Sequence, residues 1–246
     1  MRHRSLVLGE WGLGAAGSGL TGTIALFSGP SGTGKTLAAH VIARSLRLDL
    51  YRIDLSAVVS KYIGETEKNL ERVLSAAERS NALLLFDEAD ALFGKRSEVS
   101  DAHDRYANIE IAFLLQRIEA FDGVLLLATN LPGNLDDAFS RRLQFHLEFP
   151  LPDRTARERL WRQAIPAAAP TGDDLDPEFL AGMFALAGGD IRSAALQAAF
   201  LAAHEAEPIR MRHLVRAAAR LRRQQGKLPS AAEFKDYVKY AREDDG

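Results

Sequence analysis

Short apolar runs alternate with longer amphipathic stretches through residues 24–149. The apolar runs, each a candidate β-strand, are IALFS from Ile24, LYRID from Leu50, ALLLFD from Ala82, VLLLAT from Val124 and LQFHLEF from Leu143. Helical patterns fill three of the intervals, at 35–46, 65–79 and 105–121. Apolar strands separated by helices are typical of a parallel sheet that is covered on both faces. The pattern therefore predicts an α/β fold with three layers.

The pattern changes at FPLPD, residues 149–153, where the strand signals stop. The rest of the chain has helix start signals at Asp153, Asp176, Asp190, Pro208 and Ser230. Ser230 and Glu233 have the spacing of a capping box. The glycine-rich start favours a loosely ordered segment. We therefore expect a flexible lead-in at 1–23, an α/β domain at 24–151 and a small helical domain with a C-terminal helix at 152–246.

Composition excludes several classes of protein. The 246 residues are 47% hydrophobic and 26% charged, an ordinary globular composition, and no apolar run approaches the roughly 20 residues of a membrane span. The absence of cysteine excludes disulfides and thiolate metal sites. A net charge of -2 gives no general attraction to nucleic acid or anionic membranes. We expect a cytoplasmic protein without a structural metal.

The segment GPSGTGKT lies between the first apolar strand and the first helix. It matches the phosphate-binding pattern G-x-x-x-x-G-K-[ST], whose glycines let backbone amides turn towards phosphates at the N-terminus of a helix. Lys35 would reach the β- and γ-phosphates, and Thr36 would hold Mg²⁺ through its hydroxyl. The predicted nucleotide-binding residues are Gly29, Pro30, Ser31, Gly32, Thr33, Gly34, Lys35, Thr36 and Leu37, together with the acidic residue Asp87.

Two acidic residues, Asp87 and Glu88, end the apolar strand LLLFD. A carboxylate pair at a buried strand end needs a cation nearby, which fits Asp87 as a Mg²⁺ holder and Glu88 as the base that polarises the attacking water. The alternative, that the carboxylates cap a short helix EADALF, is realistic for Asp90 and weak for the pair. The two motifs predict ATP binding and Mg²⁺-dependent hydrolysis.

The order of motifs, from the phosphate loop through FDEAD and LLLATN to SRRLQF, resembles the AAA ATPases over residues 24–221. The resemblance implies a P-loop α/β core followed by a helical lid, and homo-oligomers that commonly form hexameric rings. It makes Asn130 the sensor that orients the lytic water. It also makes Arg141 or Arg142, without choosing between them, the arginine supplied to a neighbouring subunit. Arg192 in GGDIRSA is either a second sensor or an exposed first-turn residue behind Asp190.

The octet SKYIGETE, residues 60–67, resembles the substrate-gripping pore loop of AAA remodelling enzymes. In that reading Tyr62 holds polypeptide in the ring channel, flanked by Lys61 and Ile63. An aromatic side chain can grip varied residues without a fixed pocket. The alternative is that Tyr62 packs into the core, although Gly64 favours a surface turn. Together with this octet, the charged segment FGKRSEVSDAHDRYANI at residues 93–109 most resembles the sequences of bacterial AAA ATPases found with contractile phage-tail-like injection systems.

The sequence thus predicts an ATP-hydrolysing motor that threads, unfolds or disassembles a protein substrate, which an adaptor could help to recruit. Two alternatives remain open. One is a clamp-loader-like, DNA-associated ATPase, suggested by GGDIR and by arginines 212, 216, 220 and 223 on one face of a helix. The other is a scaffold that assembles with ATP but turns it over negligibly.

Overall fold

The computed structural model describes residues 22–54, 65–80, 82–90, 112–130 and 143–226. Their contacts divide the chain into two compact units, which are described separately. The first contains the β-strands. The second contains the helices after Pro150 together with Pro30–Gly34 from the phosphate loop. None of the described helices is long and apolar enough to cross a membrane.

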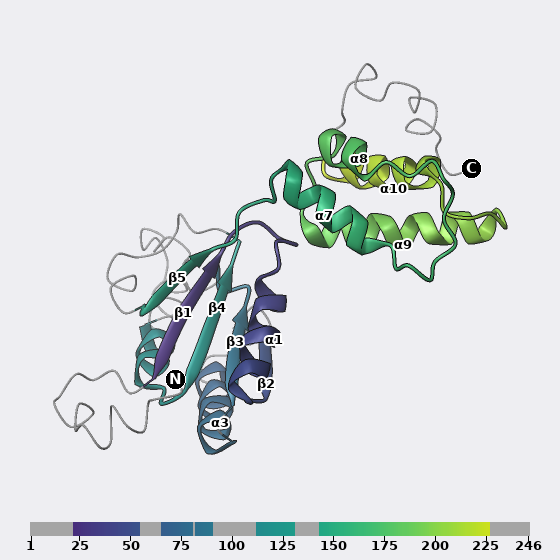
Figure 1. The fold of residues 1–246 in the computed structure, drawn as a ribbon. Helices are drawn as coiled ribbons and strands as arrows, with labels where there is room; N and C mark the ends of the chain where they lie inside the picture. Colours follow the sequence, from purple (N-terminus) through teal and green to yellow (C-terminus); the bar gives the residue numbers. More distant parts are fainter. Residues whose placement is uncertain (1–21, 55–64, 81, 91–111, 131–142, 227–246) are drawn as a thin grey trace. The chain divides into compact units, whose positions relative to one another are not determined.

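The first unit is built on a five-stranded sheet of order β2-β3-β4-β1-β5 in which every pairing is parallel (Figure 1). The strands are β1 Thr23–Ser28, β2 Leu50–Asp54, β3 Leu83–Asp87, β4 Val124–Thr129 and β5 Phe145–Glu148. The three central strands are almost wholly buried, whereas the edge strand β5 is exposed along its length. Their continuous apolar runs are what a sheet covered on both faces requires.

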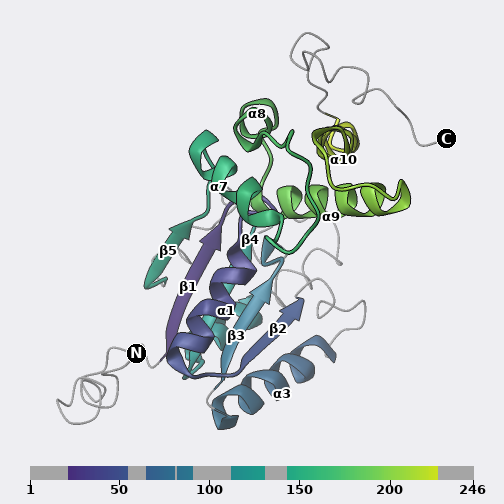
Figure 2. The same ribbon diagram turned by 45° about the vertical axis from the view of Figure 1, so that its right-hand side comes forward.

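Helices cover both faces of this sheet, and the predicted three-layer α/β fold is confirmed. On one face α1, Lys35–Leu46, packs Ala39 and Ala43 against Phe27 and Leu85. On the other face α3, Glu65–Ser80, and a helix at 112–120 pack against a second cluster that includes Phe86. Successive residues of β1, β3 and β4 alternate between the two clusters because neighbouring side chains of a strand point to opposite faces. Figure 2 shows α1 across the strands.

The second unit is helical, with α7 Arg154–Ala164, α8 Pro177–Met183, α9 Gly188–His204 and α10 Met211–Gln224 (Figure 1). Its core holds Trp161, Phe184 and Ile191 with a row of alanines from α9 and α10. Small residues let these two helices approach closely, which explains why an alanine-rich sequence folds here. Asp153 and Asp176 accept hydrogen bonds from the backbone N–H groups of Ala156 and Phe179, so both predicted N-caps are confirmed.

Two predicted helix starts are wrong. The N-cap of α9 is Ala187, which places Asp190 inside the first turn. No side chain caps this helix, and one of its first N–H groups, that of Gly189, donates to the carbonyl of Gly32 at 2.8 Å. Pro208 does not start α10, since Ile209 forms a β-bridge with Thr171 and delays the helix to Met211. The lead-in up to residue 21 and the start signal at Ser230 lie outside the described residues.

Candidate active site

The candidate site lies at the edge of the sheet where β1, β3 and β4 end. Parallel strands bring their carboxyl ends to one edge, and open α/β sheets bind ligands there. The register aligns Ser28 of β1 with Thr129 of β4, and Phe86 of β3 with Leu127 of β4. The residues that follow these three strands, which include Gly29, Glu88 and Asn130, are therefore gathered at one edge.

Lys35 is the first residue of α1 and is only 8% exposed. Its ammonium donates to the carbonyl of Gly29 at 2.6 Å and to Oδ1 of Asn130 at 2.9 Å. Burial lowers the pKa of Lys35, and the nearby carboxylates of Asp87 and Asp90 oppose that shift. A desolvated cation of this kind is poised to bind an anion, because water competes little for it.

The glycines of the phosphate loop adopt backbone conformations that side chains resist. Gly29 has φ +139°, and a Cβ atom added there would lie 2.1 Å from the carbonyl oxygen of Phe149. Gly34 has φ +107° with open space around it. Within the loop, the hydroxyl of Thr33 donates to the carbonyl of Pro30 at 2.8 Å. The motif's glycines are therefore required by φ and, at Gly29, also by close packing.

The acidic pair occupies the end of β3. Asp87 is 16% exposed; it forms an ion pair with Arg52 of β2 at 2.9 Å and accepts the N–H of Glu88 at 3.1 Å. Glu88 is exposed, and its φ of +55° is uncommon for a residue with a side chain. Such strained residues cost about 1–3 kcal/mol and cluster at functional sites. The two carboxylates thus have different surroundings: that of Asp87 is partly buried and ion-paired, whereas Glu88 is exposed to solvent.

The end of β4 is tied to the turn after β3. The hydroxyl of Thr129 donates to Oδ1 of Asp90, and the N–H of Asn130 donates to the same oxygen at 3.2 Å. The N–H of Ala89 also donates to the carbonyl of Ala128 at 2.8 Å. The carboxylate of Asp90 thus binds the next strand of the sheet, whereas the helix that it was expected to cap lies outside the described residues.

The structure brings five of the predicted site residues together where the strands end: Gly29, Lys35, Asp87, Glu88 and Asn130. Arg192 is exposed as the fifth residue of α9, and Leu37 is 67% exposed on α1. The pore-loop residues Lys61, Tyr62 and Ile63 and the arginines Arg141 and Arg142 lie outside the described residues.

Three residues at this edge were missed by sequence reasoning, namely Arg52, Asp90 in its bonded role, and Thr129. Only the strand register reveals Arg52, because nothing in LYRID distinguishes an arginine that reaches Asp87 from a solvated edge residue. The signal for Thr129 was its place beside Asn130 at the end of a buried strand.

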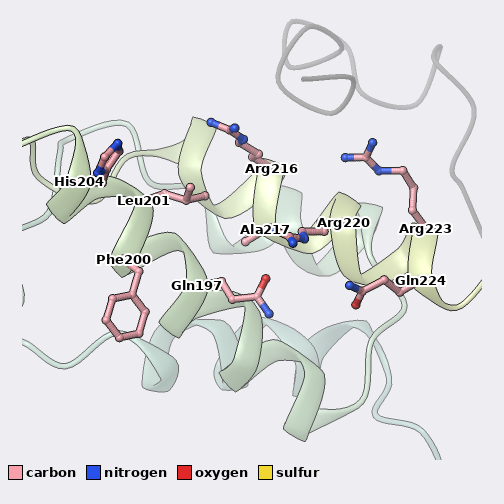
Figure 3. A pocket seen from close by; sticks show the side chains of 9 residues that line it. All are labelled: Gln197, Phe200, Leu201, His204, Arg216, Ala217, Arg220, Arg223 and Gln224. Carbon is pink, nitrogen blue, oxygen red and sulfur yellow. The ribbon is translucent and has the colours of Figure 1, made fainter. Parts of the chain in front are cut away.

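A pocket of about 370 Å³ lies in the helical unit between α9 and α10. Gln197, Phe200, Leu201 and His204 of α9 and Arg216, Ala217, Arg220, Arg223 and Gln224 of α10 line it (Figure 3). It contains none of the predicted nucleotide-binding residues.

Beside this pocket, glutamates partly neutralise the arginine face of α10. Arg212 forms ion pairs with Glu205 at 2.5 Å and with Glu207 at 2.7 Å, and Arg216 lies 4.0 Å from Glu205. Hydrogen bonds from His213 and Arg212 lower the pKa of Glu205, which keeps this acid ionised beside the arginines. The face is therefore less basic than its sequence suggests.

Comparison with known proteins relates the chain to ATPases, as the phosphate loop and the acidic pair do. Residues 25–151 match the model of the family described as "ATPase family associated with various cellular activities (AAA)". The chain is 34% identical over 182 residues to "ATPase family gene 2 protein" of Schizosaccharomyces pombe, covering 72% of this chain and 22% of that protein. It is 32% identical over 185 residues to "26S proteasome subunit RPT4" of Saccharomyces cerevisiae, covering 72% and 42%.

Spastin of Anopheles gambiae is 32% identical over 197 residues, covering 75% of this chain and 22% of spastin. The chain thus spans less than half the length of these curated relatives. The structure titled "Crystal structure of FIGL-1 AAA domain" superposes with a TM-score of 0.64 at 22% identity, covering 89% of this chain and 76% of that one, and so shares the fold. These relatives give no support to the resemblance to ATPases of phage-tail-like injection systems. The family model matches more than half of the chain, and the parallel five-stranded sheet carries the phosphate loop and the acidic pair. The chain therefore belongs to the AAA family.

Proposed function

We propose that the chain binds ATP with Mg²⁺ and hydrolyses it at the sheet edge described above. The observation that carries this proposal is the meeting of Lys35, Asp87, Glu88 and Asn130 at the ends of three parallel strands, within the segment that matches an ATPase family. Lys35 binds the phosphates, backbone amides of Gly29–Gly34 surround them, and Leu37 follows in the first turn of α1.

The acidic pair fits the other half of the reaction. Asp87 and Thr36 offer oxygen ligands of the kind that Mg²⁺ prefers, and a sheltered carboxylate at a strand end suits a divalent cation. The ion, when bound, would neutralise charge on the phosphates. Exposed Glu88 orients and deprotonates the attacking water, and Asn130 holds that water from the neighbouring strand. Under this proposal 24–151 is the ATPase domain and 152–246 the helical lid domain.

The test is phosphate release by the full chain with Mg-ATP. Glu88→Gln should keep nucleotide binding and lower turnover by about 10²- to 10⁴-fold, the contribution expected of a general base. Glu148→Gln is the matched control, because it makes the same change at an exposed residue of β5, at the carboxyl end of the same sheet. Equal turnover by Glu88→Gln and parent would refute the assignment of the base. Absence of turnover in the parent, with ATP-dependent assembly intact, would favour the scaffold.

We further propose that the hydrolysis drives remodelling of a protein substrate by a homo-oligomeric ring, with six subunits as the expected number. Supporting this are the resemblance of SKYIGETE to a pore loop and similarity to a proteasome subunit and to spastin. Lys61, Tyr62 and Ile63 would contact the polypeptide. Arg141 or Arg142 would complete a neighbour's site, a contribution of about 10³- to 10⁵-fold in rate where an arginine acts in trans. Arg192 would be a second sensor, and the protein would act in the cytoplasm.

Two measurements test the remodelling proposal. Tyr62→Ala should retain ATP hydrolysis and lose unfolding of a tagged model protein, whereas Tyr62→Phe, which keeps the aromatic surface, should retain both. Equal unfolding by Tyr62→Ala and parent would sink the pore-loop assignment. Specific ATPase activity should fall on dilution if an arginine is shared between subunits, and concentration-independent turnover would count against that.

The DNA-associated alternative is weakened by the ion pairs of α10. Glutamates already engage Arg212 and Arg216, two of the four arginines that suggested a basic face. Binding through phosphate contacts would show a steep fall in DNA affinity with salt. A titration of duplex DNA that shows such a fall at micromolar protein would revive this alternative.

A further inference from the structure

Asp90 follows the acidic pair by two residues, yet its carboxylate is directed at the neighbouring strand. Its Oδ1 accepts hydrogen bonds from the hydroxyl of Thr129 and from the N–H of Asn130, the latter at 3.2 Å, and Oδ2 lies 3.5 Å from the same N–H. One carboxylate thus binds the last residue of β4 and the residue after it. Bonds to an ionised acceptor are about twice as strong as neutral ones.

This contact is sheltered and therefore restrictive. Thr129 is fully buried at 0% exposure, and Asp90 is half-buried. A buried hydroxyl that loses its acceptor is costly, so the hydroxyl of Thr129 favours an arrangement in which Asp90 stays within hydrogen-bond distance. The backbone bond from Ala89 to Ala128 adds a second tie between the same two segments. Side-chain and backbone hydrogen bonds thus join the turn after β3 and the end of β4 into one element.

Both groups proposed for the reaction border this element. Asn130, whose backbone is held by Asp90, presents its side chain to Lys35 at 2.9 Å. Glu88 lies two residues before Asp90 in a left-handed conformation, φ +55°, which persists only when its surroundings over-determine it. A displacement of Asp90 would therefore also displace the side-chain amide of Asn130 and the carboxylate of Glu88.

We propose that Asp90 is a positioning residue for ATP hydrolysis, which acts by clamping Thr129 and the backbone of Asn130 so that the Asn130 side chain is held over the reacting water. The inference rests on the proposed function. It assigns no contact between Asp90 and nucleotide. Misplacement of a catalytic group by about 1 Å can cost 10²-fold in rate, so the clamp has a measurable consequence.

The first test separates binding from turnover. Asp90→Ala should lower kcat for Mg-ATP by about 10- to 100-fold, with the Kd for ATP nearly unchanged. Thr129→Val removes one of the two bonds at constant shape and should lower kcat by a smaller factor, and Thr129→Ser should restore it. Asp49→Ala, which removes an exposed carboxylate just before β2, is the matched control and should behave as the parent. Unchanged kcat in Asp90→Ala would overturn the inference.

The second test asks whether Asp90 acts through Asn130. In an Asn130→Ala background, Asp90→Ala should lower kcat little further, because the group that it positions is gone. The same fractional loss in both backgrounds would overturn the inference by showing an independent effect. The amide proton of Asn130, followed by NMR hydrogen exchange without nucleotide, should lose protection in Asp90→Ala. Retained protection would refute the clamp itself. Lost protection with full activity of Asn130→Ala would instead refute the role of Asn130 in the proposed function, and the inference with it.

Discussion

The first glycine of the phosphate loop offers a quantitative test of how the loop is built. Gly29 lies directly after β1; its N–H donates to the carbonyl of Thr129 at 3.2 Å, and its own carbonyl accepts the ammonium of Lys35 at 2.6 Å. In Gly29→Ala the new Cβ would meet the carbonyl oxygen of Phe149 at 2.1 Å. That atom is backbone, held by the bond from Phe149 N–H to the carbonyl of Ser28 at 2.7 Å, so it cannot turn away as a side chain would.

Two separable costs follow. An alanine at φ +139° carries backbone strain of about 1–3 kcal/mol, and forcing β1 and the segment after β5 apart adds an overpacking cost of about 1–3 kcal/mol. We therefore expect Gly29→Ala to lower the free energy of unfolding of the α/β unit by about 2–6 kcal/mol. Gly34→Ala supplies the control, since Gly34 has φ +107° with nothing within 4 Å, and should cost the strain alone, about 1–3 kcal/mol.

The assay must report on the α/β unit. One of the two tryptophans, Trp161, is in the helical unit, so tryptophan fluorescence would not follow the α/β unit alone. Hydrogen exchange of peptides from β1 and β4, measured across a urea series, follows the sheet directly. Moving Gly29 also moves the carbonyl that anchors Lys35, so ATP affinity should weaken in parallel. If Gly29→Ala destabilised the sheet no more than Gly34→Ala, the close approach to the carbonyl of Phe149 would add nothing to the free-energy cost. That result would refute the predicted overpacking.

Two further predictions concern charged groups. Lys35→Met should abolish the rise in melting temperature that ATP produces, and it should raise the melting temperature of the nucleotide-free protein. The reason for the second effect is that burial lowers the pKa of Lys35, so its charged form opposes folding at neutral pH. A nucleotide-free variant that is less stable than the parent would contradict this. Glu205 has a pKa below its ordinary 4.5, so its stabilising effect is present above that pH and is lost as the pH falls through the folded value. Between pH 5 and about 3, Glu205→Gln should flatten the loss of helical-unit stability, followed by Trp161 fluorescence in a Trp11→Phe background; an unchanged acid profile would show that the pairs with His213 and Arg212 contribute nothing.

The sequence predicted those features that depend on local pattern. Helix α1 begins and ends where its periodicity placed it, and the N-caps at Asp153 and Asp176 follow from residue type alone. The central strands were recognisable because burial on both faces demands uninterrupted apolar residues. Predictions failed where a partner distant in sequence replaced the local signal, as at α9, where the carbonyl of Gly32 accepts one first-turn N–H and no side chain caps the helix.

The same distinction applies to the site. Gly29, Lys35 and Asp87 could be recognised because their spacing within a motif carries the chemistry. Arg52 could not, since its meeting with Asp87 depends on which strands are neighbours in the sheet. The bond between Asp90 and Thr129 could not be predicted for the same reason, because the two residues are 39 positions apart in sequence.

The order of strands also explains why strain collects at this one edge. Placing β1 and β3 on either side of β4 brings the segments after all three strands close together, and each segment carries a residue of the proposed site. Gly29 takes a conformation that tolerates no side chain, Glu88 takes one that disfavours its own, and Lys35 is buried as a cation. The conformation of Glu88 and the burial of Lys35 each weaken the fold, and the hydrogen bonds that join Lys35 to Asn130 and Asn130 to Asp90 hold these segments together. A site selected for stability alone would lack these two costs, so relieving either of them should stabilise the protein only at the expense of turnover.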